Sequence, residues 1–191
     1  MLRIILNNKY LLWVLLALPL LAMMNSYASG QADALDMLHP TGEFSARFMI
    51  IAMLIGPLTD ILGRRNWLIW LVHRRRAIGV AGFAYALLHL VFYCIDMGNV
   101  PDMLAELGAP GIWTGWIAFF VMLTPALASN QAAVRLLKRN WKRVQQLTYV
   151  AALLTLAHWY FLEYDFGPAL VHFVPLIALN IVRLLMLKRK S

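Results

Sequence analysis

Six long apolar segments, separated by short polar connections, constrain the fold of this chain more than any other feature of its sequence. Each segment is about twenty residues long, the length that a helix needs to cross the hydrocarbon core of a bilayer. The segments cover residues 10–27, 44–62, 77–96, 111–129, 147–164 and 168–187. The sequence therefore predicts an all-α fold, an integral membrane six-helix bundle that forms a single transmembrane domain over residues 1–191.

Composition and motifs exclude several other classes of protein. The chain is 62% hydrophobic, whereas soluble domains are nearer half apolar. Its net charge of +8 comes from basic residues at the ends of apolar segments, so it does not predict nucleic-acid binding. The single cysteine, Cys94, excludes an internal disulfide and a C-x-x-C-H motif for covalent haem attachment. The sequence contains no phosphate-binding loop, nucleophile elbow or dinucleotide fingerprint.

Charged residues alternate between the connections, and this alternation predicts the orientation in the membrane. Connections 28–43, 97–110 and 163–168 contain acidic residues and no lysine or arginine. The basic residues lie in the other connections and at the two ends, from Arg3 and Lys9 to Lys188, Arg189 and Lys190. Basic connections stay in the cytoplasm, so we expect both termini there. The first segment also resembles a cleaved signal peptide, but the helical bundle that follows favours a membrane helix.

Two of the five histidines, His89 and His158, lie deep inside apolar segments and at matched depth. His89 follows the basic residue Arg76 by 13 positions, and His158 follows Arg143 by 15. At a rise of about 1.5 Å per residue, both histidines lie roughly 20 Å from the cytoplasmic edge. Ionisable side chains at such depth are costly and mark functional sites. We therefore expect the two imidazoles to lie at one level, in the outer half of the membrane.

Small residues line the helix face that precedes each of these histidines. Steps of three and four residues back from each histidine reach Ala86, Gly82, Gly79 and Arg75 on one helix and Thr155, Ala151 and Thr148 on the other. Two such faces leave room for a flat macrocycle, and two neutral imidazoles suit the axial positions of haem iron. The alternative is close helix packing with two hydrogen-bonded histidines. Zinc or copper is disfavoured, because Cys94 lies off the His89 face and no carboxylate lies near this depth.

The other three histidines carry weaker signals. His39 and His73 are predicted to lie in connections, as solvated or interfacial side chains. His172 lies near the outer surface, four residues into the last segment. It is a candidate third ligand, a substitute ligand or a packing residue.

Several short motifs resemble those of the ferric-reductase-like transmembrane family, and most of all its haem-binding subunits from bacterial periplasmic methionine-sulfoxide reductase systems. The likeness covers most of residues 38–165. The motifs, in chain order, are His39-Pro40-Thr41-Gly42, Ile55-Gly56-Pro57-Leu58, Arg75-Arg76-x-x-Gly79, Leu88-His89-Leu90, Ser129-Asn130-Gln131, Trp141, Tyr149 and Ala157-His158-Trp159-Tyr160.

The resemblance implies a six-helix bundle in the bacterial inner membrane that carries b-type haem, with His89 and His158 matching the family's haem ligands. It also implies a cytoplasmic electron donor, which is a flavin reductase, a flavin or a membrane quinol. The acceptor would be a periplasmic molybdopterin enzyme that reduces oxidised methionine. The chain would then be an electron-transfer subunit and not a complete enzyme.

One position departs from that family. Related proteins commonly carry a further histidine thirteen residues before the one that matches His158, and this chain has Gln145 there. Glutamine is a weak ligand for haem iron. Gln145 and Arg75 together offer hydrogen bonds and positive charge to an FMN phosphate, a quinone carbonyl or a haem propionate. We therefore expect one tightly held haem and a non-haem relay at the inner site.

Two other functions remain as alternatives. A cofactor-free membrane transporter or assembly protein would show broken helices with polar residues converging at mid-membrane. The segments contain few possible breaks, among them Pro57, Pro125 and Pro175, and no carboxylate pair within the membrane. A self-contained ferric reductase would need its own flavin and nicotinamide domain, which this sequence lacks.

Overall fold

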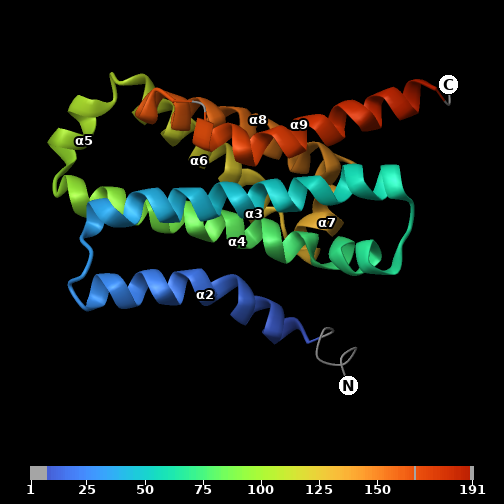
Figure 1. Ribbon diagram of the computed structural model, residues 1–191, viewed down its shortest axis with the longest axis horizontal. Helices are drawn as coiled ribbons and strands as arrows, with labels where there is room; N and C mark the ends of the chain where they lie inside the picture. Colours follow the sequence, from blue (N-terminus) through green and yellow to red (C-terminus); the bar gives the residue numbers. More distant parts are fainter. Residues whose placement is uncertain (1–7, 166, 190–191) are drawn as a thin grey trace.

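Helices make up all of the regular structure in the computed structural model, which describes residues 8–165 and 167–189. Arg3 and Lys190, which contribute to the predicted orientation, lie outside these ranges. In chain order the helices in Figure 1 are α2 (Lys9–Ala28), α3 (Ala34–Leu62), α4 (Asn66–Met97), α5 (Val100–Glu106), α6 (Pro110–Leu127), α7 (Gln131–Leu137), α8 (Asn140–Glu163) and α9 (Gly167–Lys188).

Among the described residues, five helices are long and apolar enough to cross a membrane, namely α2, α3, α4, α6 and α9. The chain is therefore a multi-pass membrane protein, and the predicted all-α fold is confirmed. The expected count of six crossings is not confirmed, because α8 does not reach the same hydropathy. This helix has 24 residues, but its first two turns carry Lys142, Arg143, Gln145 and Gln146.

Helix α3 begins ten residues before the apolar segment that predicts it. The side chain of Asp33 accepts a hydrogen bond from the N–H of Asp36 at 2.9 Å, and the Asp36 carboxylate accepts one from the N–H of Asp33 at 3.1 Å. This reciprocal pair satisfies donors that a helix start otherwise leaves free. His39 consequently lies within α3, so its predicted place in a connection is wrong. The polar composition of these first turns hides the helix from a hydropathy criterion.

Helix α4 likewise extends beyond its apolar segment. It has 32 residues, or about 48 Å at 1.5 Å per residue, which exceeds the ~30 Å thickness of a bilayer core. The prediction that His73 lies in a connection is also wrong, because the helix already begins at Asn66. The helices α5 and α7, with seven residues each, lie in the connections between the long apolar segments.

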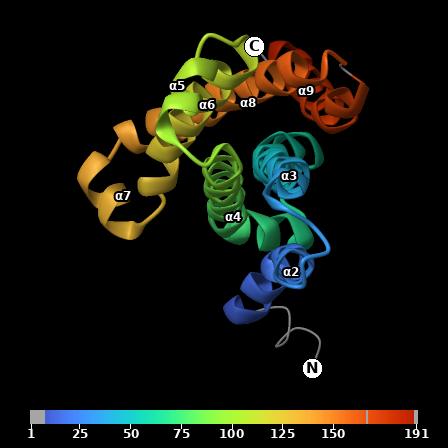
Figure 2. The same ribbon diagram turned by 90° about the vertical axis from the view of Figure 1, so that its left-hand side faces the viewer.

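The long helices pack as two antiparallel hairpins, α3 with α4 and α6 with α8. Figure 2 shows α3 and α4 nearly end-on, with α9 beside α3. Gly82 permits the close approach within the first hairpin, since a Cβ there would lie 3.1 Å from the backbone nitrogen of Met49 and 3.3 Å from the carbonyl oxygen of Ser45. The small face of α4 is thus used in part to pack against α3.

Helix α2 is joined to this hairpin by Tyr85, a buried residue of α4. Its hydroxyl accepts a hydrogen bond from the N–H of Leu20 at 2.9 Å and donates one to the carbonyl of Leu16 at 3.0 Å. The hydroxyl therefore stands between two backbone groups that are four residues apart in α2, beside Pro19. A proline and a side chain that inserts between backbone hydrogen-bonding groups are both known causes of helix kinks.

Tyr85→Phe should destabilise the protein by about 1–3 kcal/mol, because it leaves a backbone N–H and a carbonyl without their partner in an apolar setting. Unfolding of the purified protein in detergent, followed by circular dichroism, measures the change. Tyr149→Phe is the matched control, since Tyr149 is an exposed residue of α8. Equal stability of the two variants would show that the Tyr85 bridge contributes nothing.

Candidate functional site

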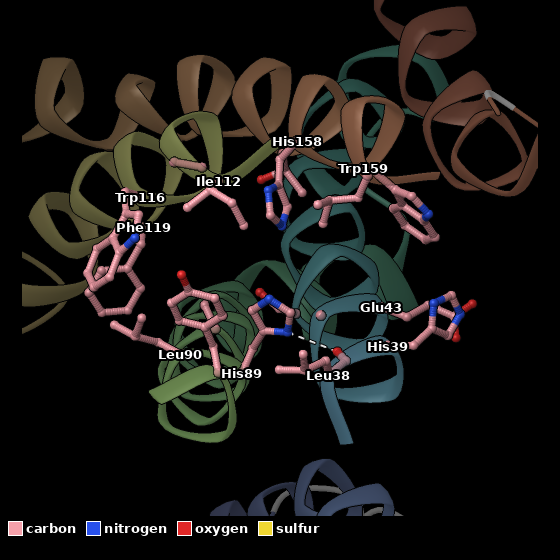
Figure 3. A pocket seen from close by; sticks show the side chains of 18 of the residues that line it. Leu38, His39, Glu43, His89, Leu90, Ile112, Trp116, Phe119, His158 and Trp159 are labelled. Atoms are coloured by element: carbon pink, nitrogen blue, oxygen red, sulfur yellow. Dashed lines mark hydrogen bonds between the residues drawn. The ribbon is translucent and has the colours of Figure 1, made fainter. Parts of the chain in front are cut away.

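A cavity of about 500 Å³ lies between the two hairpins, at the end where α3 and α6 begin and α4 and α8 end. His89 from α4 and His158 from α8 both line it, and Figure 3 shows their side chains entering from opposite sides. The two imidazole ring centroids are 6.1 Å apart, and the ring planes are close to perpendicular, at 87°. The structure thus brings together the two histidines that were expected to share one depth.

Each imidazole is held by a backbone carbonyl of the other helix in its own hairpin. His89 Nδ1 lies 2.9 Å from the Leu38 oxygen of α3, and His158 Nδ1 lies 2.6 Å from the Gly111 oxygen of α6. A carbonyl oxygen can only accept, so each Nδ1 carries the hydrogen. In a neutral imidazole the other nitrogen, Nε2, then keeps its lone pair for a metal. Both rings are therefore set up as Nε2 ligands.

The spacing of the rings suits one metal between them. Imidazole nitrogens bind transition metals at about 2.0–2.1 Å, so two rings on opposite sides of one ion have centroids about 6 Å apart. The part of the chain that the structure describes contains no group of three or more His, Cys, Asp or Glu side chains that could hold a metal ion. A metal here needs its other ligands from elsewhere, and the four nitrogens of a macrocycle would supply them. The site therefore fits haem better than a bare ion.

The cavity wall differs on the two sides of the histidine pair. One side carries the apolar side chains Leu90, Ile112, Trp116 and Phe119, and the other carries His39, Glu43 and Trp159. A cavity with an apolar portion and a few polar groups is typical of cofactor sites.

The polar side of the wall belongs to a network of charged and polar side chains. His39 Nδ1 lies 3.3 Å from a carboxylate oxygen of Glu163. His172 does not line the cavity. Its Nε2 accepts a hydrogen bond from Arg47 Nε at 3.1 Å and lies 3.4 Å from a carboxylate oxygen of Glu43, which also pairs with Arg47. His172 thus lies behind Glu43, one residue away from the cavity.

The other three predicted cofactor residues also lie outside the cavity wall. Gly82 lies at the contact between α3 and α4. Arg75 is exposed, and its guanidinium lies 3.9 Å from where a Cβ on Gly56 would be. The side-chain amide of Gln145 donates a hydrogen bond to the carbonyl of Pro125 at 3.1 Å, which joins α8 to the end of α6.

Sequence reasoning missed the groups that orient the two imidazoles. The carbonyls of Leu38 and Gly111 carry no sequence signal of their own. Each carbonyl lies three residues before a threonine, however, and the dipeptide Thr-Gly occurs only twice in the chain, at positions 41–42 and 114–115. That repetition could have located both sites. The position of His39 in the wall was missed because the helical start of α3 was missed.

Comparisons with known proteins identify the family of this chain. The family profile described as ferric reductase like transmembrane component matches residues 41–156, which include His89 and end two residues before His158. No solved structure gives a significant match.

The curated relatives carry one name, protein-methionine-sulfoxide reductase heme-binding subunit MsrQ. The relative from Xanthomonas oryzae pv. oryzae is 34% identical over 140 residues, 72% of this chain and 62% of its own length. The relative from Cronobacter sakazakii is 32% identical over 167 residues, which are 81% of this chain and 82% of its own length. The first of these alignments leaves more than a third of the relative uncovered. The profile match covers more than half of this chain. The chain therefore belongs to the ferric-reductase-like transmembrane family, and its relatives include proteins named MsrQ.

Proposed function

We propose that this chain is a membrane electron-transfer subunit that holds one b-type haem between His89 and His158. The observation that carries the proposal is the pair of imidazole rings, 6.1 Å apart between centroids in a cavity at one end of the bundle. The relatives' printed name, heme-binding subunit, supports the same cofactor. Without a C-x-x-C-H motif in the chain, the haem would be held by its axial ligands and by packing.

Haem bound at this site would supply one-electron chemistry, because its iron alternates between two oxidation states. The chain's own residues provide two neutral imidazoles whose free Nε2 atoms face a common space. Trp116 and Phe119 cover the apolar side of that space and keep water from it. Because His89 and His158 belong to different hairpins, shared coordination would also join the two halves of the bundle.

We further propose that electrons enter from a cytoplasmic flavin reductase or a membrane quinol, and leave to a periplasmic molybdopterin enzyme that reduces oxidised methionine. The relatives' printed name as subunits of a protein-methionine-sulfoxide reductase supports this acceptor.

A second electron carrier is needed at the opposite end of the bundle. Arg75 precedes His89 by 14 residues, or about 21 Å along a helix. We propose that FMN or a quinone binds there, near the exposed guanidinium of Arg75. Gln145 uses its amide N–H for Pro125, so its amide oxygen stays able to accept a hydrogen bond from this carrier. Gly82 would contribute by holding α4 against α3, and His172 by supporting Glu43 in the cavity wall.

For the membrane arrangement, we propose an inner-membrane protein in which residues 1–191 form one domain, α8 is a sixth crossing and both termini are cytoplasmic. The charge pattern supports this orientation. The connections next to the haem cavity are acidic, and those at the opposite end are basic.

His89→Ala and His158→Ala should each abolish the low-spin spectrum of the purified protein and remove most of its haem, because a single imidazole cannot complete the coordination. Reduced-minus-oxidised absorption spectra measure this loss. His73→Ala is the control, since this exposed histidine bonds to the carbonyl of Ile69 in the first turns of α4. Full, unshifted haem in both cavity variants would refute the assignment.

The purified protein should contain one haem per chain, because Gln145 replaces the histidine that a second haem would need. A pyridine haemochrome assay against protein concentration gives this ratio, and Gln145→Ala should leave it unchanged. A ratio of two would show that another ligand set exists, and the non-haem relay would then be abandoned.

Alkaline phosphatase, which is active only in the periplasm, should be inactive when fused after the last residue and active when fused after Gly108. The first result follows from the basic C-terminal end, and the second from the acidic connection 97–110. An active C-terminal fusion would overturn the proposed orientation.

A further inference from the structure

The same five-residue arrangement occurs at the start of α3 and at the start of α6. Residues 38–42 read Leu-His-Pro-Thr-Gly, and residues 111–115 read Gly-Ile-Trp-Thr-Gly. In each segment the first residue supplies the carbonyl that holds an imidazole in the cavity. The fourth and fifth residues, Thr-Gly, are common to both, although the two helices belong to different hairpins.

The two threonines make equivalent hydrogen bonds. Thr41 Oγ1 donates toward the carbonyls of Met37 at 2.6 Å and Leu38 at 3.1 Å. Thr114 Oγ1 donates toward the carbonyls of Pro110 at 2.5 Å and Gly111 at 2.9 Å. A hydroxyl has one hydrogen, and in both cases its shorter contact is with the carbonyl four residues back, while its longer contact is with the carbonyl that holds the imidazole.

Both threonines are buried, at 0% and 2% exposure. At the first site Thr41 Oγ1 also lies 3.4 Å from His89 Nδ1.

The two glycines are equivalent as well. A Cβ on Gly42 would lie 3.1 Å from His89 Nδ1, and a Cβ on Gly115 would lie 2.6 Å from both Nδ1 and Cε1 of His158. Real Cβ atoms essentially never approach as closely as the second distance. Each ring therefore lies directly against the backbone of the neighbouring helix, at a place that no other residue type leaves open.

We propose that Thr41–Gly42 and Thr114–Gly115 are a duplicated clamp that fixes the rotation of the two axial imidazoles and holds their planes near perpendicular. This inference rests on the proposed haem ligation and adds positioning residues to it. The threonine sets the direction of the Nδ1–H hydrogen bond, and the glycine sets how closely the ring approaches. Within each hairpin, the helix without a ligating histidine, α3 or α6, thus orients the histidine of the other helix, α4 or α8.

The clamp has a spectroscopic consequence. Perpendicular axial imidazoles leave two iron dπ orbitals nearly equal in energy, which gives ferric haem a highly anisotropic low-spin EPR signal with a large maximum g value. Parallel rings split these orbitals and give an ordinary rhombic signal. The observed interplanar angle of 87° predicts the first signal for the wild-type protein. A residue that acts only on global stability would not change its shape.

Low-temperature EPR and redox titration of the haem-loaded, full-length protein test the clamp. Gly42→Ala should keep its haem but shift the maximum g value and the midpoint potential, because the ring must move by only a few tenths of an ångström. Gly115→Ala requires a larger displacement and should lose most of its low-spin haem. Thr41→Val should shift the signal, and Thr41→Ser should restore it.

Matched controls lie on the same helix α3. Gly56→Ala meets only the guanidinium end of Arg75 at 3.9 Å. Thr59→Val removes a hydroxyl that bonds to the Ile55 carbonyl, four residues back, at 2.7 Å. Neither control should change the EPR signal or the potential. If Gly115→Ala does not fold, Gly42→Ala and Thr41→Val still test the clamp.

The outcomes separate the clamp from the haem assignment. Wild-type protein without bound haem, or with haem that survives both His89→Ala and His158→Ala, would refute the ligation itself. Wild-type protein with bis-histidine haem, but with Gly42→Ala and Thr41→Val indistinguishable from their controls, would overturn only the clamp.

Discussion

The hydrogen bond from each buried imidazole to a neighbouring backbone carbonyl is the interaction on which the site depends. In an apolar bundle an ionisable ring is stable only with a partner, and here the partners are Leu38 and Gly111. The same bonds choose the tautomer, so that satisfying Nδ1 frees Nε2. One requirement of membrane folding thus also leaves two Nε2 lone pairs available to a metal.

The requirement extends to the arrangement of the helices. Each histidine and its carbonyl belong to one hairpin, so each hairpin contains one complete imidazole–carbonyl pair of the site. The two halves face each other across a cavity with an aromatic side and a polar side. A cofactor bound by both histidines would act as a structural link as well as an electron carrier. The two halves also share a core cluster of buried residues from α3, α6, α8 and α9.

Much of this could be read from the sequence. Segment length and charge alternation predict a helical membrane protein, and the distances from the basic clusters predict that His89 and His158 lie together. Helix starts in polar sequence, such as the capped start of α3 at Asp33, escape a hydropathy criterion. The role of Gly82 could not be read either, because a small residue serves a cofactor and a neighbouring helix equally well, and the α3 backbone lies 3.1 Å from where its Cβ would be. The orienting carbonyls are set by tertiary packing, and their one local signal is the Thr-Gly dipeptide that follows each of them.

The central claim is that two imidazoles, from α4 and α8, ligate one iron. Near-infrared magnetic circular dichroism of the oxidised, purified protein tests it most directly, because the energy of the ligand-to-iron charge-transfer band depends on the axial ligands of low-spin haem. We predict the band of bis-imidazole coordination. A band of histidine–methionine or high-spin haem, or the absence of haem from folded protein, would contradict the claim.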